Sequence, residues 1–209
     1  MQGIKHIIFD LGGVILNIDY QLTDKAFTEL GVKNFKELYS QYKGSSLFNG
    51  LETGHVSTEE FLEAMHKHVP ETVTDKQLKT AWNAMLLDFP VQRLQLLQQL
   101  RQHYGLYLLS NTNAIHLEEF NRLLLESRGI PSLSSFFDRA YYSHEMGQRK
   151  PDKEAYQMVL DENGLIPAET LFIDDLAQNI EGARAVGLQT IHLAPPKTIL
   201  DIFRPANAV

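Results

Sequence analysis

The sequence predicts an α/β fold, a doubly wound parallel sheet of Rossmann-like type with a small helical cap inserted into it. Two observations predict the sheet: short apolar runs end in glycine or polar residues, and apolar residues between these runs recur at helical spacing. Strands that alternate with helices form parallel sheets covered on both faces. A third observation predicts the cap, because one long stretch after the first run shows helical patterns alone.

The apolar runs give the positions of the predicted strands. Each of the three clearest runs ends in a glycine pair or in polar residues, which is typical of a buried strand that leads into a tight loop. The predicted strands are residues 4–9, 106–109 and 170–173, with weaker candidates at 140–142 and 190–193.

Helices are predicted between the strands by apolar spacing and by their stop signals. Leucines at 94, 97 and 100 share one face of a helix that ends before Gly105. A second helix is expected to start after Pro151 and to stop at Gly164, and a third to stop at Gly187. These positions place a helix before or after each predicted strand, as a doubly wound sheet requires.

Residues 20–88 show no apolar run of the strand type and predict several helices, including 58–68 and 75–87. Ser57 and Glu60 have the spacing of a capping box, in which the two residues satisfy each other's main-chain N–H groups. We therefore predict that residues 17–88 form a helical cap domain, and that residues 1–16 and 89–209 form the α/β core domain.

Composition narrows the class of protein. The formal net charge is −7 with no run of lysine and arginine, which argues against nucleic-acid and anionic-membrane partners. The chain has no cysteine, so disulfides and thiolate metal sites are excluded. No signal peptide or membrane-spanning segment is evident, and we expect a cytoplasmic protein. The sequence does not indicate an oligomeric state.

Polar residues follow three of the predicted strands. Asp10, the pair Ser110-Asn111 and the pair Asp174-Asp175 each come directly after an apolar run, and Arg149-Lys150-Pro151 precedes a helix. Ligands of open parallel sheets bind beyond the carboxyl ends of the strands, so these groups are expected to converge. Carboxylate oxygens suit Mg²⁺, and lysine and main-chain amides suit a phosphoryl group.

In this order and spacing, the four motifs resemble those of the haloacid-dehalogenase superfamily, over nearly the whole chain. They stand here as Asp10-Leu11-Gly12-Gly13-Val14, Ser110-Asn111, Lys150-Pro151 and Asp174-Asp175 with Asn179 after it. The resemblance implies a Mg²⁺-dependent phosphatase in which Asp10 is the nucleophile and forms an aspartyl-phosphate.

The resemblance also implies roles for the other residues. Mg²⁺ would be held by the Asp10 carboxylate, the Gly12 carbonyl and Asp175, with Asp174 as a secondary ligand or the holder of a water molecule. Phosphoryl oxygens would be bound by the remaining motif residues, and Asn179 would orient the metal shell. The residues that bind phosphoryl oxygens or screen their charge are Ser110, Asn111 and Lys150.

Gly12 departs from the superfamily pattern, which has a second aspartate there to protonate the leaving group. Loss of a positioned acid or base typically lowers a rate about 10²- to 10⁴-fold. Asp19 or His116 could replace it, although Asp19 also fits a helix cap and His116 a surface position near a helix start. Alternatively, the substrate has a more acidic leaving group, or the protein only binds phosphometabolites.

The motifs further resemble one branch of the superfamily, which includes bacterial α-D-glucose-1-phosphate phosphatases that also have glycine at this position. Residues 110–116 and the Arg149-Lys150-Pro151 motif carry this resemblance. It implies that the glycine need not abolish catalysis, and it does not fix the substrate. The small cap and the argument from the leaving group favour a small phosphorylated metabolite, such as a sugar 1-phosphate. His116 is also a candidate substrate-binding residue, and within the predicted cap Asn83 is a candidate for a hydroxyl contact, whereas Trp82 is expected to lie in the core of the cap.

Three other functions stay open at the level of sequence. A dehalogenase would use the same nucleophile without metal, but two further carboxylates beside Asp10 would repel it in the absence of a cation. A mutase or phosphotransferase would pass the phosphoryl group to another hydroxyl. A catalytically weak binding protein would retain the pocket without turnover.

Overall fold

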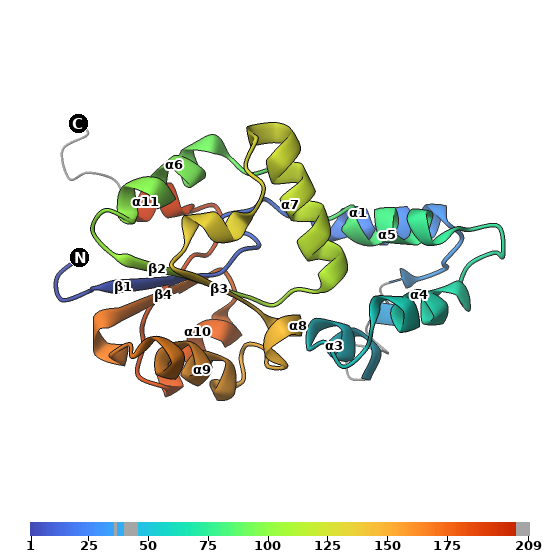
Figure 1. Ribbon diagram of the computed structural model, residues 1–209. Coiled ribbons are helices and arrows are strands. Elements are labelled where there is room, and N and C mark those ends of the chain that lie inside the picture. Colours follow the sequence, from blue (N-terminus) through green and yellow to red (C-terminus); the bar gives the residue numbers. More distant parts are fainter. Residues whose placement is uncertain (36, 40–45, 204–209) are drawn as a thin grey trace.

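The computed structural model describes residues 1–35, 37–39 and 46–203, and its centre is a five-stranded parallel sheet (Figure 1). The strand order is β3-β2-β1-β4-β5, with β1 in the middle. The strands are β1 (His6–Phe9), β2 (Gly105–Ser110), β3 (Arg139–Tyr142), β4 (Thr170–Asp174) and β5 (Gln189–His192). In register, Ile8 of β1 lies opposite Tyr107 of β2 and Phe172 of β4. All five predicted strands are confirmed.

Helices cover both faces of the sheet, so the doubly wound architecture is also confirmed (Figure 1). Side chains alternate along each strand: Ile7 and Phe9 of β1 pack into one apolar cluster, and Ile8 packs into the other. The helices of the first cluster are α6 (Val91–Leu100), α7 (Ala114–Arg128) and α11 (Ile199–Ile202); those of the second are α9 (Lys153–Asn163) and α10 (Ala177–Ala185).

Short elements connect these helices and strands. A left-handed Gly164 ends α9, as its sequence predicts, and it does so without a Cβ that would strain this conformation. The short elements are the 3₁₀ helices η1 (Leu133–Phe136) and η2 (Pro167–Glu169) and the one-turn helix α8 (Ser143–Met146).

A group of helices lies beyond the carboxyl ends of the strands (Figure 1). It has its own apolar cluster, in which the ring of Trp82 lies near the rings of Phe27, Phe48 and Phe61. The predicted capping box is present, with Ser57 and Glu60 bonded to each other's main chain. These helices are α1 (Tyr20–Glu29), α3 (Ser46–Glu52), α4 (Thr58–His66) and α5 (Asp75–Asn83). The division at residues 16/17 and 88/89 into two folding domains stays a prediction.

Two strand-like segments connect this cap to the core and run side by side. The N–H of Asn17 donates to the carbonyl of Asp88, and the N–H of Leu87 donates back to Asn17, both at 3.0 Å. The N–H of Asp19 donates to Met85 at 2.9 Å. Helix α5 therefore ends at Asn83, earlier than the sequence pattern predicts, because the next residues pair with the other connecting segment.

Among the described residues, no helix is both long enough and apolar enough to cross a membrane.

Candidate active site

Three carboxylates meet at the carboxyl edge of the two central strands. Asp10 follows β1, Asp174 ends β4, and Asp175 comes next in the chain. The main-chain N–H of Asp10 donates to the carbonyl of Ile173 at 2.9 Å, which continues the parallel pairing and fixes Asp10 beside the end of β4. One oxygen from each carboxylate lies within 4.8 Å of the others. The edge predicted to carry the chemistry therefore does bring these groups together.

Lys150 lies between two of these carboxylates. Its Nζ donates to Asp10 Oδ1 at 2.6 Å and to Asp174 Oδ2 at 2.8 Å, and the side chain is 1% exposed. The Asn111 side chain holds the lysine main chain: its Oδ1 accepts from the Lys150 N–H at 2.9 Å, and its Nδ2 donates to the Lys150 carbonyl at 2.8 Å. The core thus fixes this lysine at both ends.

Asp174 accepts hydrogen bonds from Asn179 and Leu176 in addition to Lys150. Asn179 Nδ2 lies 3.1 and 3.0 Å from its two oxygens, and the Leu176 N–H donates to it at 2.8 Å. Asn179 is itself held in place, because its carbonyl accepts from the Tyr156 hydroxyl at 2.7 Å. The asparagine predicted to orient a metal shell therefore contacts Asp174 directly.

The net charge of the site favours binding of a cation. Burial raises the pKa of Asp10 to about 7, Lys150 opposes this shift, and Asp174 and Asp175 add to it. Burial opposes the charge on Lys150, but Asp10 and Asp174 raise its pKa above the ordinary value. With all three carboxylates ionised, one ammonium group would leave two negative charges uncompensated in a largely buried cluster. A divalent cation with hard oxygen ligands fits this donor set in both charge and chemistry.

Two glycines after Asp10 allow the loop after β1 to approach neighbouring side chains closely. Gly13 has a φ of +73°, and a Cβ at this position would lie 2.5 Å from Asp175 Oδ2, so only glycine lets the β1 loop pass here. At Gly12, a Cβ would lie 2.9 Å from the Cδ1 atom of Ile18, which fills the adjacent space with an apolar side chain. Sequence reasoning singled out Gly12 alone, although the positive φ that a Gly-Gly pair permits was a signal for Gly13.

Ser110 ends β2 and is buried at the same edge of the sheet, next to Asn111. The loop that follows is held by Ser143, a residue that sequence reasoning missed. The Ser143 hydroxyl accepts from the Thr112 N–H at 2.8 Å and donates to the Thr112 carbonyl at 2.9 Å. A serine that begins a short helix gives no sequence signal for this role, because its partner lies in another loop.

His116 and Asn83 lie together at the junction of cap and core. His116 Nδ1 is 2.7 Å from Asn83 Oδ1, and the His116 ring stacks on Trp82 at 5.1 Å between centroids. Burial lowers the pKa of His116 to about 3, so the ring is neutral near pH 7. The described contacts of His116 involve α5 and its own helix rather than the carboxylates of the crevice. Substrate binding by His116 and Asn83 stays a prediction.

Asp19, the other candidate for the missing acid, caps a helix. Its Oδ1 accepts from the Gln21 N–H at 2.9 Å at the start of α1. The N-cap interpretation of this residue is therefore confirmed. One oxygen of this carboxylate is therefore engaged in capping the helix.

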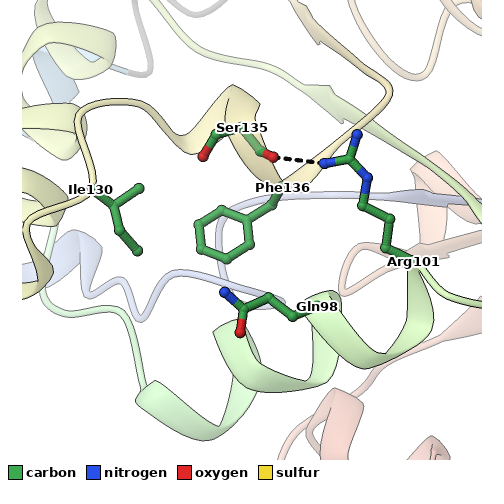
Figure 2. A pocket seen from close by; sticks show the side chains of 5 residues that line it. All are labelled: Gln98, Arg101, Ile130, Ser135 and Phe136. Atoms are coloured by element: carbon green, nitrogen blue, oxygen red, sulfur yellow. Dashed lines mark hydrogen bonds between the residues drawn. The ribbon is translucent and has the colours of Figure 1, made fainter.

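One pocket among the described residues lies outside this crevice. It has a volume of about 270 Å³ and lies between α6 and η1, where Arg101 donates to the Ser135 carbonyl at 2.8 Å (Figure 2). A larger groove of about 730 Å³ runs between α5 and α7. Neither cavity includes Asp10 or its partners, so the chemistry is located by side chains rather than by cavity size.

The family follows from a comparison with known proteins. The profile of the haloacid dehalogenase-like hydrolases matches residues 4–187, so the chain belongs to this family of hydrolases. The expected family membership, fold class and hydrolase character are thus confirmed.

Particular relatives narrow the comparison. A D-ribitol-5-phosphate phosphatase of Bacteroides thetaiotaomicron is 33% identical over 187 residues, which cover 90% of each chain. A haloacid-dehalogenase family enzyme of the same organism, solved as a magnesium complex, is 34% identical with a TM-score of 0.89, over 98% of this chain and 100% of that one. An aspartate-to-alanine variant of that enzyme, in complex with magnesium and inorganic phosphate, also has a TM-score of 0.89 at 33% identity, over 97% and 100%.

Proposed function

We propose that the protein is a Mg²⁺-dependent phosphatase that hydrolyses a small phosphorylated metabolite through an aspartyl-phosphate on Asp10. The observation that carries this proposal is the buried trio in which Lys150 Nζ binds both Asp10 and Asp174. A dehalogenase needs no cation, whereas this cluster, with its carboxylates ionised, has two excess negative charges that a cation would balance. The relatives whose names include a phosphatase activity or magnesium support the same function.

The residues of this chain divide the chemistry between them. An Asp10 oxygen attacks phosphorus, the bond from phosphorus to the leaving oxygen breaks, and that oxygen takes a proton from water. A second water then attacks phosphorus of the acyl phosphate, the bond from phosphorus to the Asp10 oxygen breaks, and the proton that this water loses neutralises the hydroxide left by the first step. Inorganic phosphate and the Asp10 carboxylate are thereby released. Lys150 and the amides after Ser110 hold the phosphoryl oxygens and stabilise the charge that develops on them.

Asp10, Asp175 and the Gly12 carbonyl would hold the metal ion, with Asp174 next to them as a support. When bound, Mg²⁺ supplies a positive charge that offsets the repulsion between the Asp10 carboxylate and the phosphoryl oxygens. Asn179 positions Asp174 and thereby keeps the cluster in place.

The proposed chemistry does not define the leaving group of the substrate. We propose a sugar or polyol phosphate, as the named relative suggests. Gly12 favours a sugar 1-phosphate among these, because the anomeric hydroxyl is more acidic than an ordinary alcohol and loses less without an acid. Ribitol 5-phosphate has an ordinary alcohol as leaving group. A preference for the sugar 1-phosphate would therefore support the argument from Gly12, and a preference for ribitol 5-phosphate would support the argument from the relative. The cytoplasmic location and the absence of nucleic-acid partners stay predictions.

The test is phosphate release from a panel that contains α-D-glucose 1-phosphate, ribitol 5-phosphate, a hexose 6-phosphate and acetyl phosphate, with Mg²⁺ or with EDTA. We expect activity that needs Mg²⁺ and that falls at least about 10³-fold in Asp10→Asn, which lacks the nucleophile. Intact-protein mass after an acid quench is expected to show one added phosphoryl group in the wild type, and none in the variant.

Asp19→Asn is the matched control, because it makes the same chemical change at a nearby aspartate and asparagine is also a good N-cap. Its activity is expected to stay near that of the wild type. Equal losses in both variants would make Asp19 the missing acid. Full activity in EDTA or in Asp10→Asn would contradict the proposed function, and phosphate binding without any turnover would leave only a binding protein.

A further inference from the structure

Arg149 is the residue of the Arg149-Lys150-Pro151 motif to which the proposed chemistry gives no role. Its side chain reaches away from the carboxylates and binds the cap: Nη1 donates to Asn49 Oδ1 at 2.8 Å, and Nη2 lies 2.8 Å from Glu52 Oε2. Both partners lie on α3. One guanidinium therefore connects the loop that carries the essential lysine to the last turn of a cap helix.

This clasp, formed by Arg149, Asn49 and Glu52, is not needed to hold the lysine. The main chain of Lys150 is fixed by Asn111, and its ammonium group by Asp10 and Asp174, all within the core. Loss of the arginine side chain would leave these contacts in place. What the arginine positions is therefore the cap and not the lysine.

A second contact at the same junction shows how closely the cap approaches the core. Gly54, two residues after α3, has a φ of +71°, and a Cβ there would overlap the main-chain oxygen of His144 in α8. Helices α3 and α8 also lie next to each other in the ribbon diagram (Figure 1). The segment after α3 thus packs in close contact with the core, near Arg149.

Two tyrosines interact electrostatically with groups of the clasp and of the carboxylate cluster. Burial raises the pKa of Tyr39, Glu52 adds to the shift and Arg149 opposes it. Burial also raises the pKa of Tyr20, and Asp10 and Asp175 add to that shift, as do Tyr39 and Glu52 to a smaller extent. Tyr20 is therefore within electrostatic reach of both the carboxylates and the clasp.

We propose that Arg149 is a positioning residue that determines substrate specificity, because it holds the end of α3 over the crevice where hydroxyl groups of a sugar or polyol leaving group bind. The proposal rests on the proposed phosphatase function. It assigns the phosphoryl half of the substrate to the core and the hydroxylated half to the clasp. A substrate without hydroxyl groups, such as acetyl phosphate, would not use the clasp.

The experiment measures kcat and KM of Arg149→Ala, Glu52→Ala and the double variant with two substrates. One is acetyl phosphate, and the other is whichever of ribitol 5-phosphate and α-D-glucose 1-phosphate the wild type hydrolyses faster. For the hydroxylated substrate we expect kcat/KM to fall about tenfold or more, mainly through KM, in each single variant. For acetyl phosphate we expect a change of less than about threefold.

Because both side chains belong to one clasp, we expect kcat/KM of the double variant for the hydroxylated substrate to fall no further than in the more impaired single variant. The matched control is Arg101→Ala, which removes a guanidinium that also binds a carbonyl, of Ser135, and a carboxylate, of Asp138, far from the crevice (Figure 2). Its kinetics with both substrates are expected to equal those of the wild type.

Equal losses with both substrates would mean that Arg149 acts on the phosphoryl half and would overturn the inference. The inference would also be overturned if Arg149→Ala had the kinetics of the Arg101 control, or if the losses in the double variant were additive. A wild type that hydrolyses acetyl phosphate but neither hydroxylated substrate would overturn it as well. A failure of the proposed function is distinguishable, because the wild type would then hydrolyse acetyl phosphate without Mg²⁺, or not at all.

Discussion

Two contacts between the cap and the core, among the described residues, differ in chemistry. Between α5 and α7 the contact is buried and neutral: Trp82 stacks on His116, and the Trp82 indole and the His116 N–H both point to Asn113 Oδ1, at 3.4 and 3.0 Å. Between α3 and the loop after α8 the contact is charged, and the side chains of Arg149 and Glu52 are 27% and 22% exposed.

The two junctions differ in what it takes to separate them. Opening the aromatic junction would expose a large apolar area, which is unfavourable at about 25 cal/mol per Å². Opening the clasp would return two charges to water, which solvates them well. We therefore expect that any opening of the cap occurs at the clasp, with the aromatic junction as the pivot.

The largest effect is expected at the aromatic junction. Trp82→Ala removes a buried ring that contacts four other aromatic rings, and we expect the free energy of unfolding to fall by about 3–5 kcal/mol. Urea unfolding measures it, with Trp82→Phe as the conservative control that keeps most of the packing. A loss below about 1 kcal/mol would mean that the junction is not a structural pivot.

Acid should weaken the same junction. In the folded protein the pKa of His116 is about 3, whereas the unfolded value is about 6.5, so between these values only the unfolded chain takes up the proton. Unfolding free energy is therefore lost as the pH falls below about 6.5, by up to about 1.4 kcal/mol per pH unit from this residue. Urea unfolding of the wild type and of His116→Gln across this range isolates the contribution, and parallel pH profiles would refute it.

At the clasp side, Gly54→Ala tests close approach of the main chains. We expect a loss of about 1–3 kcal/mol, because alanine is strained at positive φ and its Cβ would overlap His144. Gly129→Ala is the control: its φ is +68°, but no atom lies within 4 Å of the added Cβ. Equal thermal shifts for the two variants would show that backbone strain alone acts at Gly54.

The smallest effect on stability is expected for the clasp itself. Arg149→Ala removes a partly exposed ion pair and a hydrogen bond, and we expect less than about 1 kcal/mol of unfolding free energy to be lost, with the difference shrinking at high salt. A much larger loss of unfolding free energy in urea would mean that the clasp stabilises the fold as strongly as the aromatic junction does. The expectation that the cap opens at the clasp would then have no basis.

The strands and the clustered carboxylates were predictable because local patterns determine them. A buried strand of a parallel sheet is a continuous apolar run, and its carboxyl end carries the polar residues, so the convergence of Asp10, Lys150 and Asp174 follows from topology. Helix ends were less predictable. Helix α5 stops at Asn83 because the residues after it pair with a distant segment, which no local pattern shows.

The cap contacts could not be read from the sequence for the same reason. His116 looked like a surface residue near a helix start, and the fold instead buries it against Trp82, which lies 34 positions away in the chain and on another helix. Arg149 was visible only as a neighbour of Lys150. Its partners Asn49 and Glu52 are about 100 residues distant, and a side chain that connects a loop to a distant helix leaves no periodic signal.

Gly13 has a consequence for the identity of the metal ion. Since it lacks a Cβ, the loop after β1 passes the Asp175 carboxylate at contact distance. Mg²⁺ demands a regular arrangement of oxygen ligands at about 2.0–2.1 Å, whereas Ca²⁺ accepts more varied arrangements at about 2.3–2.6 Å. A side chain at position 13 would displace the Asp175 carboxylate, so we expect substitution of this glycine to weaken binding of Mg²⁺ more than binding of Ca²⁺.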